Sequence, residues 1–249
     1  MTLGVVGALR EELDDVLRLM ADAHREQSAG REFFVGHLYG VPVVCTLSRV
    51  GKVAAAHTAA LLIERFSCTS IVFTGVAGGL ADGVQVGDIV VGTQFVQHDL
   101  DARPIFPRYE VPLTGLARFA ADPHLSQRLL AAARDVAARS ASVVGAEAAA
   151  AFALHAPTVH AGLIASGDRF VSSNAESQAL RADLPEALAV EMEGAAFAQV
   201  CHDHGVPFAA VRTISARADD AAHVDFLAFV RAVASRYSAA LVERLLANR

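Results

Sequence analysis

VEMEG at residues 190–194 carries two acids, Glu191 and Glu193, directly after an apolar run. GALREE at residues 7–12 repeats this arrangement, because its two acids follow the apolar run of residues 3–7. In each motif the acids stand where a buried strand ends and a helix begins, and ligands of open α/β sheets bind at the carboxyl ends of strands. Carboxylates at such an edge transfer protons or hold hydroxyl groups. The alternative interpretation is structural: these are first-turn acids favoured by the helix macrodipole.

Apolar runs and helix-like segments alternate along the whole chain. Strands are predicted over residues 3–7, 33–39, 41–47, 70–74, 88–97, 158–166, 187–190 and 206–214, and helices over residues 10–23, 51–66, 123–139, 192–204 and 226–248. The Ala-rich residues 141–157 fit either a helical extension or a surface loop. This alternation predicts an α/β fold with a largely parallel or mixed sheet between helices. Because no Pro/Gly/Ser-rich linker interrupts it, we expect one domain over residues 1–249.

The composition excludes some classes of protein. Apolar residues make up 53% of the 249, and aromatic residues only 6%, which suits a core of Ala, Val and Leu between buried strands. The formal net charge of −6 argues against a nucleic-acid partner, which requires a basic surface.

Three scattered cysteines, Cys45, Cys68 and Cys201, have no metal-ligand spacing and are expected to be buried and unpaired. The first residues lack a basic segment and reach charged residues too early for a signal peptide. No uncharged apolar stretch approaches the roughly 18–20 residues of a membrane span. We therefore expect a cytoplasmic protein with no membrane partner. The ten histidines form no metal-ligand motif, so no metal site is predicted.

A glycine-rich motif, TGVAGGL at residues 74–80, follows a β-branched run. Its glycines let the backbone approach a ligand and present amide groups to it, or they form a tight structural turn.

Five motifs occur in register along the chain: GALREE, TGVAGGL, VGDIVV at residues 86–91, SGDRFV at residues 166–171, and VEMEG. Together they resemble the purine nucleoside phosphorylase superfamily, most closely its 5′-methylthioadenosine/S-adenosylhomocysteine nucleosidase branch. The likeness extends roughly over residues 3–229. It implies a nucleoside phosphorylase-like, single-domain, three-layer α/β/α sandwich with a mixed central sheet.

The resemblance also implies roles for individual residues. Glu12 matches the acid that orients the attacking water, and Glu193 matches the acid that holds the ribose hydroxyls and supports the ribosyl cation. Met192 matches a residue that packs on the sugar, Phe170 one that stacks on the purine, and Val171 a backbone contact to the base. Further matches line or organise the ribose, water and base region: Glu191, Arg212, Gly78, Val76 and Ser215. Plain core packing is the alternative for Phe170 and Met192.

The choice between hydrolysis and phosphorolysis depends on the first motif. Phosphorylases of the superfamily carry a Gly-Asp-Pro-x-Arg type loop where this chain has GALREE, and Glu12 would repel a phosphate dianion. Many relatives also have a hydroxyl residue at the position of Val76. The sequence therefore favours water as the nucleophile and no cofactor, although Arg10 and Arg49 remain candidates for binding an anion.

One position departs from the family pattern. Nucleosidases of this type usually read Ile-Ser-Asp-x-Ala-Asp after the strand that carries Arg212, and the first Asp acts on purine N7 as the general acid. Here Ala216 stands at that position, and Asp219 matches the second acid. Three explanations are open: an Asp-to-Ala replacement made to trap a ligand, a weak or differently wired enzyme, or a nucleoside-binding protein on an enzyme scaffold.

Apolar residues are expected around the 5′ group of the nucleoside. In the family, the region after residue 98 crosses a dimer interface and closes the neighbour's 5′-alkylthio pocket. The expected lining residues are Leu9, Val50, Ile105, Phe106 and Phe226. The sequence thus predicts a homodimeric hydrolase that releases adenine from 5′-methylthioadenosine and S-adenosylhomocysteine. The alternatives are a phosphate-dependent purine nucleoside phosphorylase and a catalytically silent nucleoside-binding protein.

Overall fold

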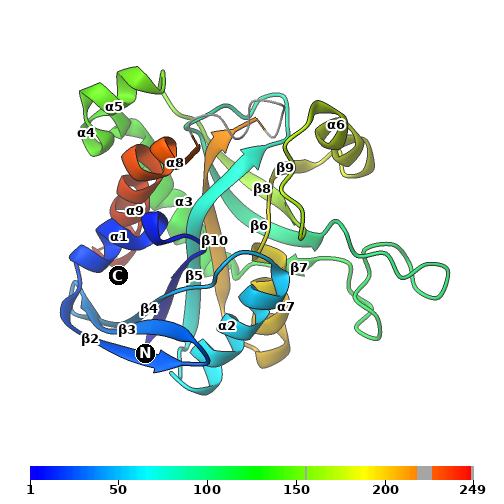
Figure 1. Ribbon diagram of the computed structural model, residues 1–249, viewed down its shortest axis with the longest axis horizontal. Coiled ribbons are helices and arrows are strands. Elements are labelled where there is room, and N and C mark those ends of the chain that lie inside the picture. Colours follow the sequence, from blue (N-terminus) through cyan, green and yellow to red (C-terminus); the bar gives the residue numbers. More distant parts are fainter. Residues whose placement is uncertain (155, 218–225, 248–249) are drawn as a thin grey trace.

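The computed structural model describes residues 1–154, 156–217 and 226–247. Its strands are β1 (Leu3–Gly7), β2 (Ala21–Ser28), β3 (Arg31–Leu38), β4 (Val41–Leu47), β5 (Ser70–Gly79), β6 (Ile89–Gln97), β7 (Phe119–Ala120), β8 (Val159–Ser166), β9 (Ala187–Glu191) and β10 (Phe208–Ala216). Its helices are α1 (Arg10–Arg18), α2 (Lys52–Glu64), α3 (Pro123–Ala138), α4 (Ser140–Val144), α5 (Ala146–Ala151), α6 (Asn174–Asp183), α7 (Gly194–His204), α8 (Phe226–Phe229) and α9 (Ser235–Ala247), with a π-helical turn, Val230–Ala234, between the last two. Figure 1 shows their arrangement.

The strands form one mixed sheet in which β5 is central. Strand β5 pairs in parallel with β1 and β10 and antiparallel with β9. Strands β6 and β8 complete a closed ring, β5-β10-β6-β8-β9, while β4, β3 and β2 extend the sheet beyond β1. The predicted α/β fold with a mixed sheet between helices is confirmed.

Helices cover both faces of the sheet because neighbouring residues of a strand point to opposite faces. On β1, Val5 packs into a core with α1, α3 and α9, and Val6 packs into a second core with α2 and α7. In Figure 1 these two groups of helices lie on opposite sides of β5 and β10. Within the described ranges, no helix is long and apolar enough to cross a lipid bilayer.

Several predicted boundaries were wrong. The helix predicted over residues 10–23 ends at Arg18, and the chain turns back as the edge strand β2, whose side chains are mostly exposed. The strand predicted over residues 70–74 continues to Gly79. The glycines of TGVAGGL therefore belong to a strand and not to a turn after it, because β9 and β10 supply hydrogen-bonding partners to that backbone.

For one further segment the sequence allowed two alternatives, and elsewhere it failed to predict a helix or an interruption. The Ala-rich residues 141–157 hold the short helices α4 and α5, in agreement with the helical alternative. Helix α6 was not predicted, although Ser173 caps it by accepting a hydrogen bond from the Glu176 amide. The helix predicted over residues 226–248 is interrupted by the π-helical turn.

Between β6 and β7 the chain leaves the body of the molecule and projects outward, on the right of Figure 1. We call residues 100–118 the arm. The arm carries exposed apolar side chains, including Ile105, which is 81% exposed, and Leu113, which is 91% exposed.

Close packing inside the ring gives a test of the fold. A Cβ at Gly92 would lie 2.4 Å from Phe95 Cζ and 3.0 Å from Ile164 Cδ1, and both side chains are fully buried. We expect Gly92→Ala to lower the free energy of unfolding by about 1–3 kcal/mol through overpacking. Urea denaturation measures this change. Gly83→Ala is the control, because no atom lies within 4 Å of the added methyl group, and equal effects of the two substitutions would contradict the packing argument.

Candidate active site

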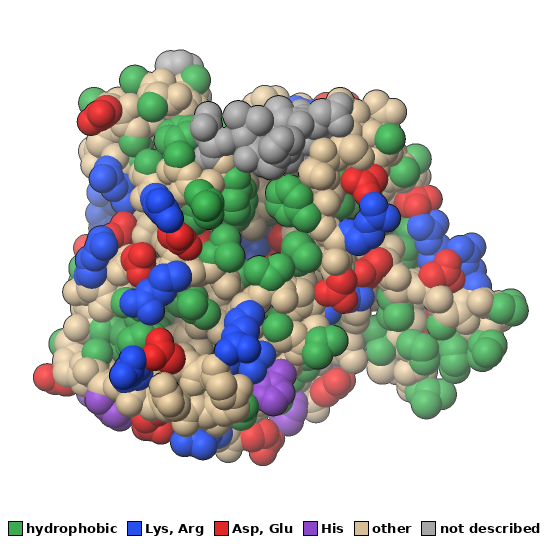
Figure 2. Space-filling model, viewed as in Figure 1, with side chains coloured by type: hydrophobic (Ala, Val, Ile, Leu, Met, Phe, Trp, Pro, Cys, Tyr) green, Lys and Arg blue, Asp and Glu red, His purple; other side chains and the backbone are tan. Residues whose placement is uncertain are grey.

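One pocket opens where strands end, and Figure 2 shows it as a hollow rimmed by hydrophobic side chains. Its walls come from residues at or just after the carboxyl ends of β1, β4, β5, β8, β9 and β10, and from the start of α8. The lining residues are Ala8, Leu9, Glu12, Val50, Val76, Ala77, Gly78, Arg169, Phe170, Val171, Val190, Glu191, Met192, Glu193, Ser215, Ala216 and Phe226. Both acidic motifs therefore contribute to the same pocket.

Glu12 lies in the first turn of α1 and is buried. Its Oε2 accepts hydrogen bonds from the amides of Ala8, at 2.6 Å, and Leu9, at 2.9 Å, and its Oε1 accepts one from the Val76 amide at 3.1 Å. Burial raises the pKa of the Glu12 carboxyl, although these hydrogen bonds and the charge of Arg212 oppose the change. A raised pKa brings a carboxylate closer to the range of a general base at neutral pH.

Gly75 leaves room for this carboxylate. A Cβ at Gly75 would lie 2.7 Å from Glu12 Oε1. A glycine at this point of β5 is therefore required for Glu12 to reach the Val76 amide.

Glu191 ends β9 and is held by several donors at once. Its Oε2 lies 2.7 Å from Arg212 Nη2, and the side chains of the pair are only 2% and 1% exposed. The Ser166 hydroxyl donates to Oε1, and the Gly194 amide lies within 3.0 Å of both carboxylate oxygens. These donors use the lone pairs of the carboxylate, so Glu191 is held in place and is not free to bind a ligand through several bonds.

Arg212 lies behind Glu191 and not on the pocket wall. Its guanidinium stacks on the ring of Phe73, 4.1 Å from the centroid, and Nη1 donates to the Phe73 carbonyl at 3.3 Å. Arg212 therefore neutralises the buried Glu191 and contacts the pocket only through it.

Glu193 differs from Glu191 in its number of partners. Among the residues that the structure describes, only the Gly51 amide donates to its side chain, to Oε1 at 2.8 Å. Burial and then the neighbouring charge of Glu191 raise the pKa of the Glu193 carboxyl. Its Oε2 is therefore the acceptor of this motif that remains open to a ligand.

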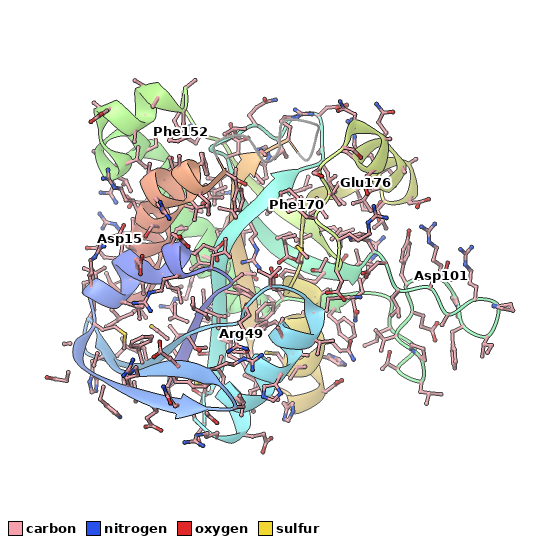
Figure 3. The ribbon with its side chains drawn as sticks, viewed as in Figure 1. Asp15, Arg49, Asp101, Phe152, Phe170 and Glu176 are labelled. Atoms are coloured by element: carbon pink, nitrogen blue, oxygen red, sulfur yellow. The ribbon has the colours of Figure 1, made fainter. Side chains whose placement is uncertain are left out.

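The apolar walls include two aromatic rings. Phe170 is 50% exposed and meets Phe226 edge to face, with 6.1 Å between ring centroids. Figure 3 shows Phe170 near the middle of the molecule, away from the arm that carries Asp101. A half-exposed ring at the mouth of an apolar pocket offers a stacking face to a flat ligand.

Ala216 lines the pocket at the end of β10 and pairs with Gly78 across a register shift after Ile214. Its methyl group gives the ligand neither a proton nor a hydrogen bond. Asp219, the second acid of the family motif, lies outside the described residues.

Most predicted site residues thus lie together, with three exceptions. Arg212 lies behind the wall, and Ile105 and Phe106 lie on the arm, outside the pocket of their own chain. Arg10 and Arg49, the candidates for anion binding, do not line the pocket either. Arg10 pairs with Asp14, and Arg49 donates to the Gly30 carbonyl.

Sequence reasoning missed Ser166 and Gly51, which hold the two acids of VEMEG. Ser166 opens the SGDRFV motif, which was a signal that it belongs to the site. Gly51 carried none, because its amide meets Glu193 across 142 positions of sequence.

The sequence and the fold match a known class. A family model described as the phosphorylase superfamily matches residues 2–247. A 5′-methylthioadenosine/S-adenosylhomocysteine nucleosidase from Shewanella denitrificans is 36% identical over 246 residues, 99% of each chain. A nucleosidase of the same name from Neisseria meningitidis, solved with methylthio-immucillin-A, has a TM-score of 0.86 at 34% identity over 98% of each chain. One from Streptococcus pneumoniae, solved with a transition-state inhibitor, has a TM-score of 0.85 at 28% identity over 98% of each chain.

The chain therefore belongs to the phosphorylase superfamily. Within it, the chain belongs to the family of 5′-methylthioadenosine/S-adenosylhomocysteine nucleosidases.

The raised pKa of Glu193 predicts how stability depends on pH. A carboxyl whose pKa is higher in the folded than in the unfolded protein stabilises the fold below its unfolded value, about 4.3. That contribution is lost as the pH rises through the folded value. Glu193→Gln abolishes this loss while keeping an acceptor for the Gly51 amide. We expect the variant to gain stability relative to the wild type between about pH 5 and pH 9, by about 1.4 kcal/mol for each unit of raised pKa.

Urea unfolding of the ligand-free wild type and of Glu193→Gln, at about pH 5 and at about pH 9, measures this difference in stability. Glu12 remains in both proteins, so its own raised pKa cancels from the comparison. Parallel pH profiles for the two proteins would show that Glu193 titrates normally in the fold.

Proposed function

We propose that this chain is a one-domain purine nucleoside hydrolase that cleaves the N-glycosidic bond of 5′-methylthioadenosine and S-adenosylhomocysteine and releases adenine. The observation that carries the proposal is the convergence of Glu12, Glu191 and Glu193 on one apolar pocket with an exposed aromatic face. Glycosidic cleavage passes through an oxocarbenium-like sugar cation, which carboxylates stabilise. The names of the relatives agree with this substrate class.

Glu12 activates the water in this proposal. An ionised carboxylate has about four acceptor sites, and three amides occupy three of them on Glu12. The remaining site faces a pocket to which Glu12 belongs, so it accepts a proton from a bound water as the sugar cation forms. No cofactor takes part, because water is the nucleophile.

Glu193 binds the ribose. In its ionised form, Glu193 accepts hydrogen bonds from the ribose hydroxyls through its open Oε2, and its charge stabilises the developing cation. Glu191 and Arg212 position Glu193 through the amides that follow β9, since Glu191 Oε2 accepts from the Glu193 amide at 3.2 Å. Met192 packs on the sugar, and Phe170 stacks on the purine, with Val171 at the base edge. Leu9, Val50 and Phe226 lie where they contact an apolar 5′ substituent.

The pocket disfavours phosphate. Among its described lining residues the only cation is Arg169, whose side chain is 76% exposed and pairs with Glu176. Three carboxylates repel a phosphate dianion, which phosphate sites normally bind with Arg or Lys and hydroxyl donors. Val76 supplies no hydroxyl. These features favour hydrolysis over phosphorolysis.

We propose a homodimer in which the arm, with Ile105 and Phe106, closes the 5′ end of the neighbour's pocket. The exposure of Ile105 and Leu113 on the same projecting segment supports this, because removing apolar side chains from water is favourable. Sedimentation equilibrium measures the assembly. We further propose a cytoplasmic location, which the three buried, unpaired cysteines support.

The first test concerns the nucleophile. In phosphate-free buffer, the Ala216→Asp form is expected to release adenine and free sugar at the same rate as in phosphate, because Glu12 activates water. Glu12→Gln in that form is expected to lower turnover by about 10²–10⁴-fold. Adenine release and sugar analysis provide the measurement. Formation of the 1-phosphate of the substrate's sugar, with its 5′ substituent retained, would instead show a phosphorylase.

The second test concerns Ala216. The chain as written is expected to bind adenosine-type ligands but to turn them over slowly, because stacking and ribose contacts remain while a proton donor to the leaving purine is lost. Such a loss lowers kcat more than ground-state affinity. Ala216→Asp should raise single-turnover adenine release at saturating substrate by about 10²–10⁴-fold.

If Ala216→Asp leaves the rate unchanged, then either another residue such as Asp219 supplies the proton or the chain is not a nucleosidase. Adding Asp219→Asn to the Ala216→Asp form distinguishes these two cases. It lowers the rate of adenine release in the first case and leaves that rate unchanged in the second.

A further inference from the structure

Beside the pocket, three segments meet at Lys52, Asp99 and Asp168, which we call the Lys52 cluster. Lys52 is the first residue of α2, Asp99 follows β6, and Asp168 follows β8. Lys52 Nζ lies 2.6 Å from Asp99 Oδ1, the Lys52 amide donates to Asp168 Oδ1 at 2.7 Å, and the Asp168 amide donates to Asp99 Oδ2 at 2.8 Å. Each member thus bonds to both others.

The cluster lies at the surface, because Asp99 and Asp168 are exposed residues. The two charged side chains of the ion pair are partly covered, since those of Lys52 and Asp99 are 15% and 27% exposed. Burial alone would raise the pKa of Asp99, but the hydrogen bonds from Lys52 and the Asp168 amide outweigh it, and the pKa is lowered. Lys52 Nζ also donates to Gln97 Oε1 at 3.2 Å, and Gln97 donates to Gln199 Oε1 on α7 at 2.8 Å. These multiple bonds distinguish this ion pair from isolated surface pairs, which contribute little.

Two members of the cluster are next in sequence to residues that contact Glu193 or line the pocket. Gly51 precedes Lys52, and its amide is the donor to Glu193. Gly51 has a φ of +96°, and a Cβ there would lie 3.1 Å from Asp168 Oδ1. On the other side, Asp168 directly precedes residues 169–171, which line the pocket. The cluster therefore joins Gly51, whose amide binds the Glu193 carboxylate, to the segment that carries Phe170.

We propose that the Lys52 cluster is a positioning element of the active site, which holds the Gly51 amide on Glu193 and keeps residues 169–171 at the pocket wall. Its members do not line the pocket and act through these neighbours. The effect on catalysis rests on the proposed function, whereas the effect on Glu193 does not. If the cluster opens, Glu193 loses its hydrogen-bond donor and Phe170 loses its fixed position.

The direct test follows the Glu193 carboxyl in the ligand-free protein by ¹³C NMR titration, with Glu193→Gln to assign its signal. Asp99→Asn breaks the ion pair. Loss of the Gly51 hydrogen bond raises the pKa of Glu193, whereas removal of a negative charge without any rearrangement would lower it. The other charged groups that face Glu193 are Glu191, Glu12 and Arg212, and the substitution leaves them in place.

Asp135→Asn is the control. It removes the same charge from a surface ion pair with Arg139 at the end of α3, and Asp135 belongs neither to the pocket wall nor to the arm. We expect an upward shift in the Glu193 titration for Asp99→Asn and none for Asp135→Asn. No shift, or a downward shift, for Asp99→Asn would overturn the inference.

Turnover provides the second readout, measured in the Ala216→Asp form. We expect Asp99→Asn to raise KM and to lower kcat/KM for adenine release by about 10²-fold, the usual effect of a displacement of about 1 Å in a site. Lys52→Arg, which retains the charge, should keep most of the activity, and Asp135→Asn should keep all of it.

The outcomes separate the two proposals. If the Ala216→Asp form releases no adenine, the proposed function fails, while the NMR titration still decides the role of the cluster. If Asp99→Asn does not fold, as judged by circular dichroism, Asp168→Ala makes the same test, because it also removes a negative charge and a bond to Lys52. If neither variant folds, the cluster is required for folding itself, and a role confined to positioning is refuted.

Discussion

Strand β5 pairs with β10 along most of its length, with β1 over Ser70–Phe73, and with β9 through Gly78 and Gly79 at its end. Because β5 serves three neighbours, β9 and β10 end beside its last residues with Glu191 and Ala216, and Glu12, on α1 after β1, reaches β5 at the Val76 amide. Gly75 permits this last contact, since it leaves space for the Glu12 carboxylate. If β5 ended at Thr74, the sheet would not close into its ring, and the two acidic motifs would not share a pocket.

The buried pair of Glu191 and Arg212 is the main electrostatic cost of this arrangement. Two charges that are almost fully removed from water require good geometry and additional hydrogen bonds. The structure provides these through Ser166, the Gly194 amide and the face of Phe73. We attribute the pair to placement of the backbone after β9 and not to net stability, because buried ion pairs seldom stabilise more than well-packed apolar side chains.

The three carboxylates differ because their environments differ. Glu191 is saturated by donors, Glu12 has three amides and the more distant Arg212, and Glu193 has one amide and a neighbouring negative charge. Groups of one type take different roles when their surroundings separate their proton affinities. In our proposal this separation assigns water activation to Glu12, ribose binding to Glu193 and positioning to Glu191. Ala216 then interrupts the remaining step, protonation of the leaving base, without disturbing the others.

Local sequence patterns were sufficient to predict much of the fold and many of the site residues. The alternation of apolar runs predicted the buried strands β1, β3 to β6 and β8 to β10, and the acids of GALREE and VEMEG stood at or after the ends of their strands as expected, because burial and helix starts depend on nearby residues. The two-residue strand β7 was missed. Strand β2 escaped prediction because its polar side chains are exposed and only backbone pairing with β3 holds it. The extension of β5 through its glycines, the isolation of Ile105 and Phe106 from their own pocket, and the Lys52 cluster were decided by the tertiary structure alone. Each depends on partners far apart in sequence, such as Lys52, Asp99 and Asp168, and no local periodicity records which distant segments will meet.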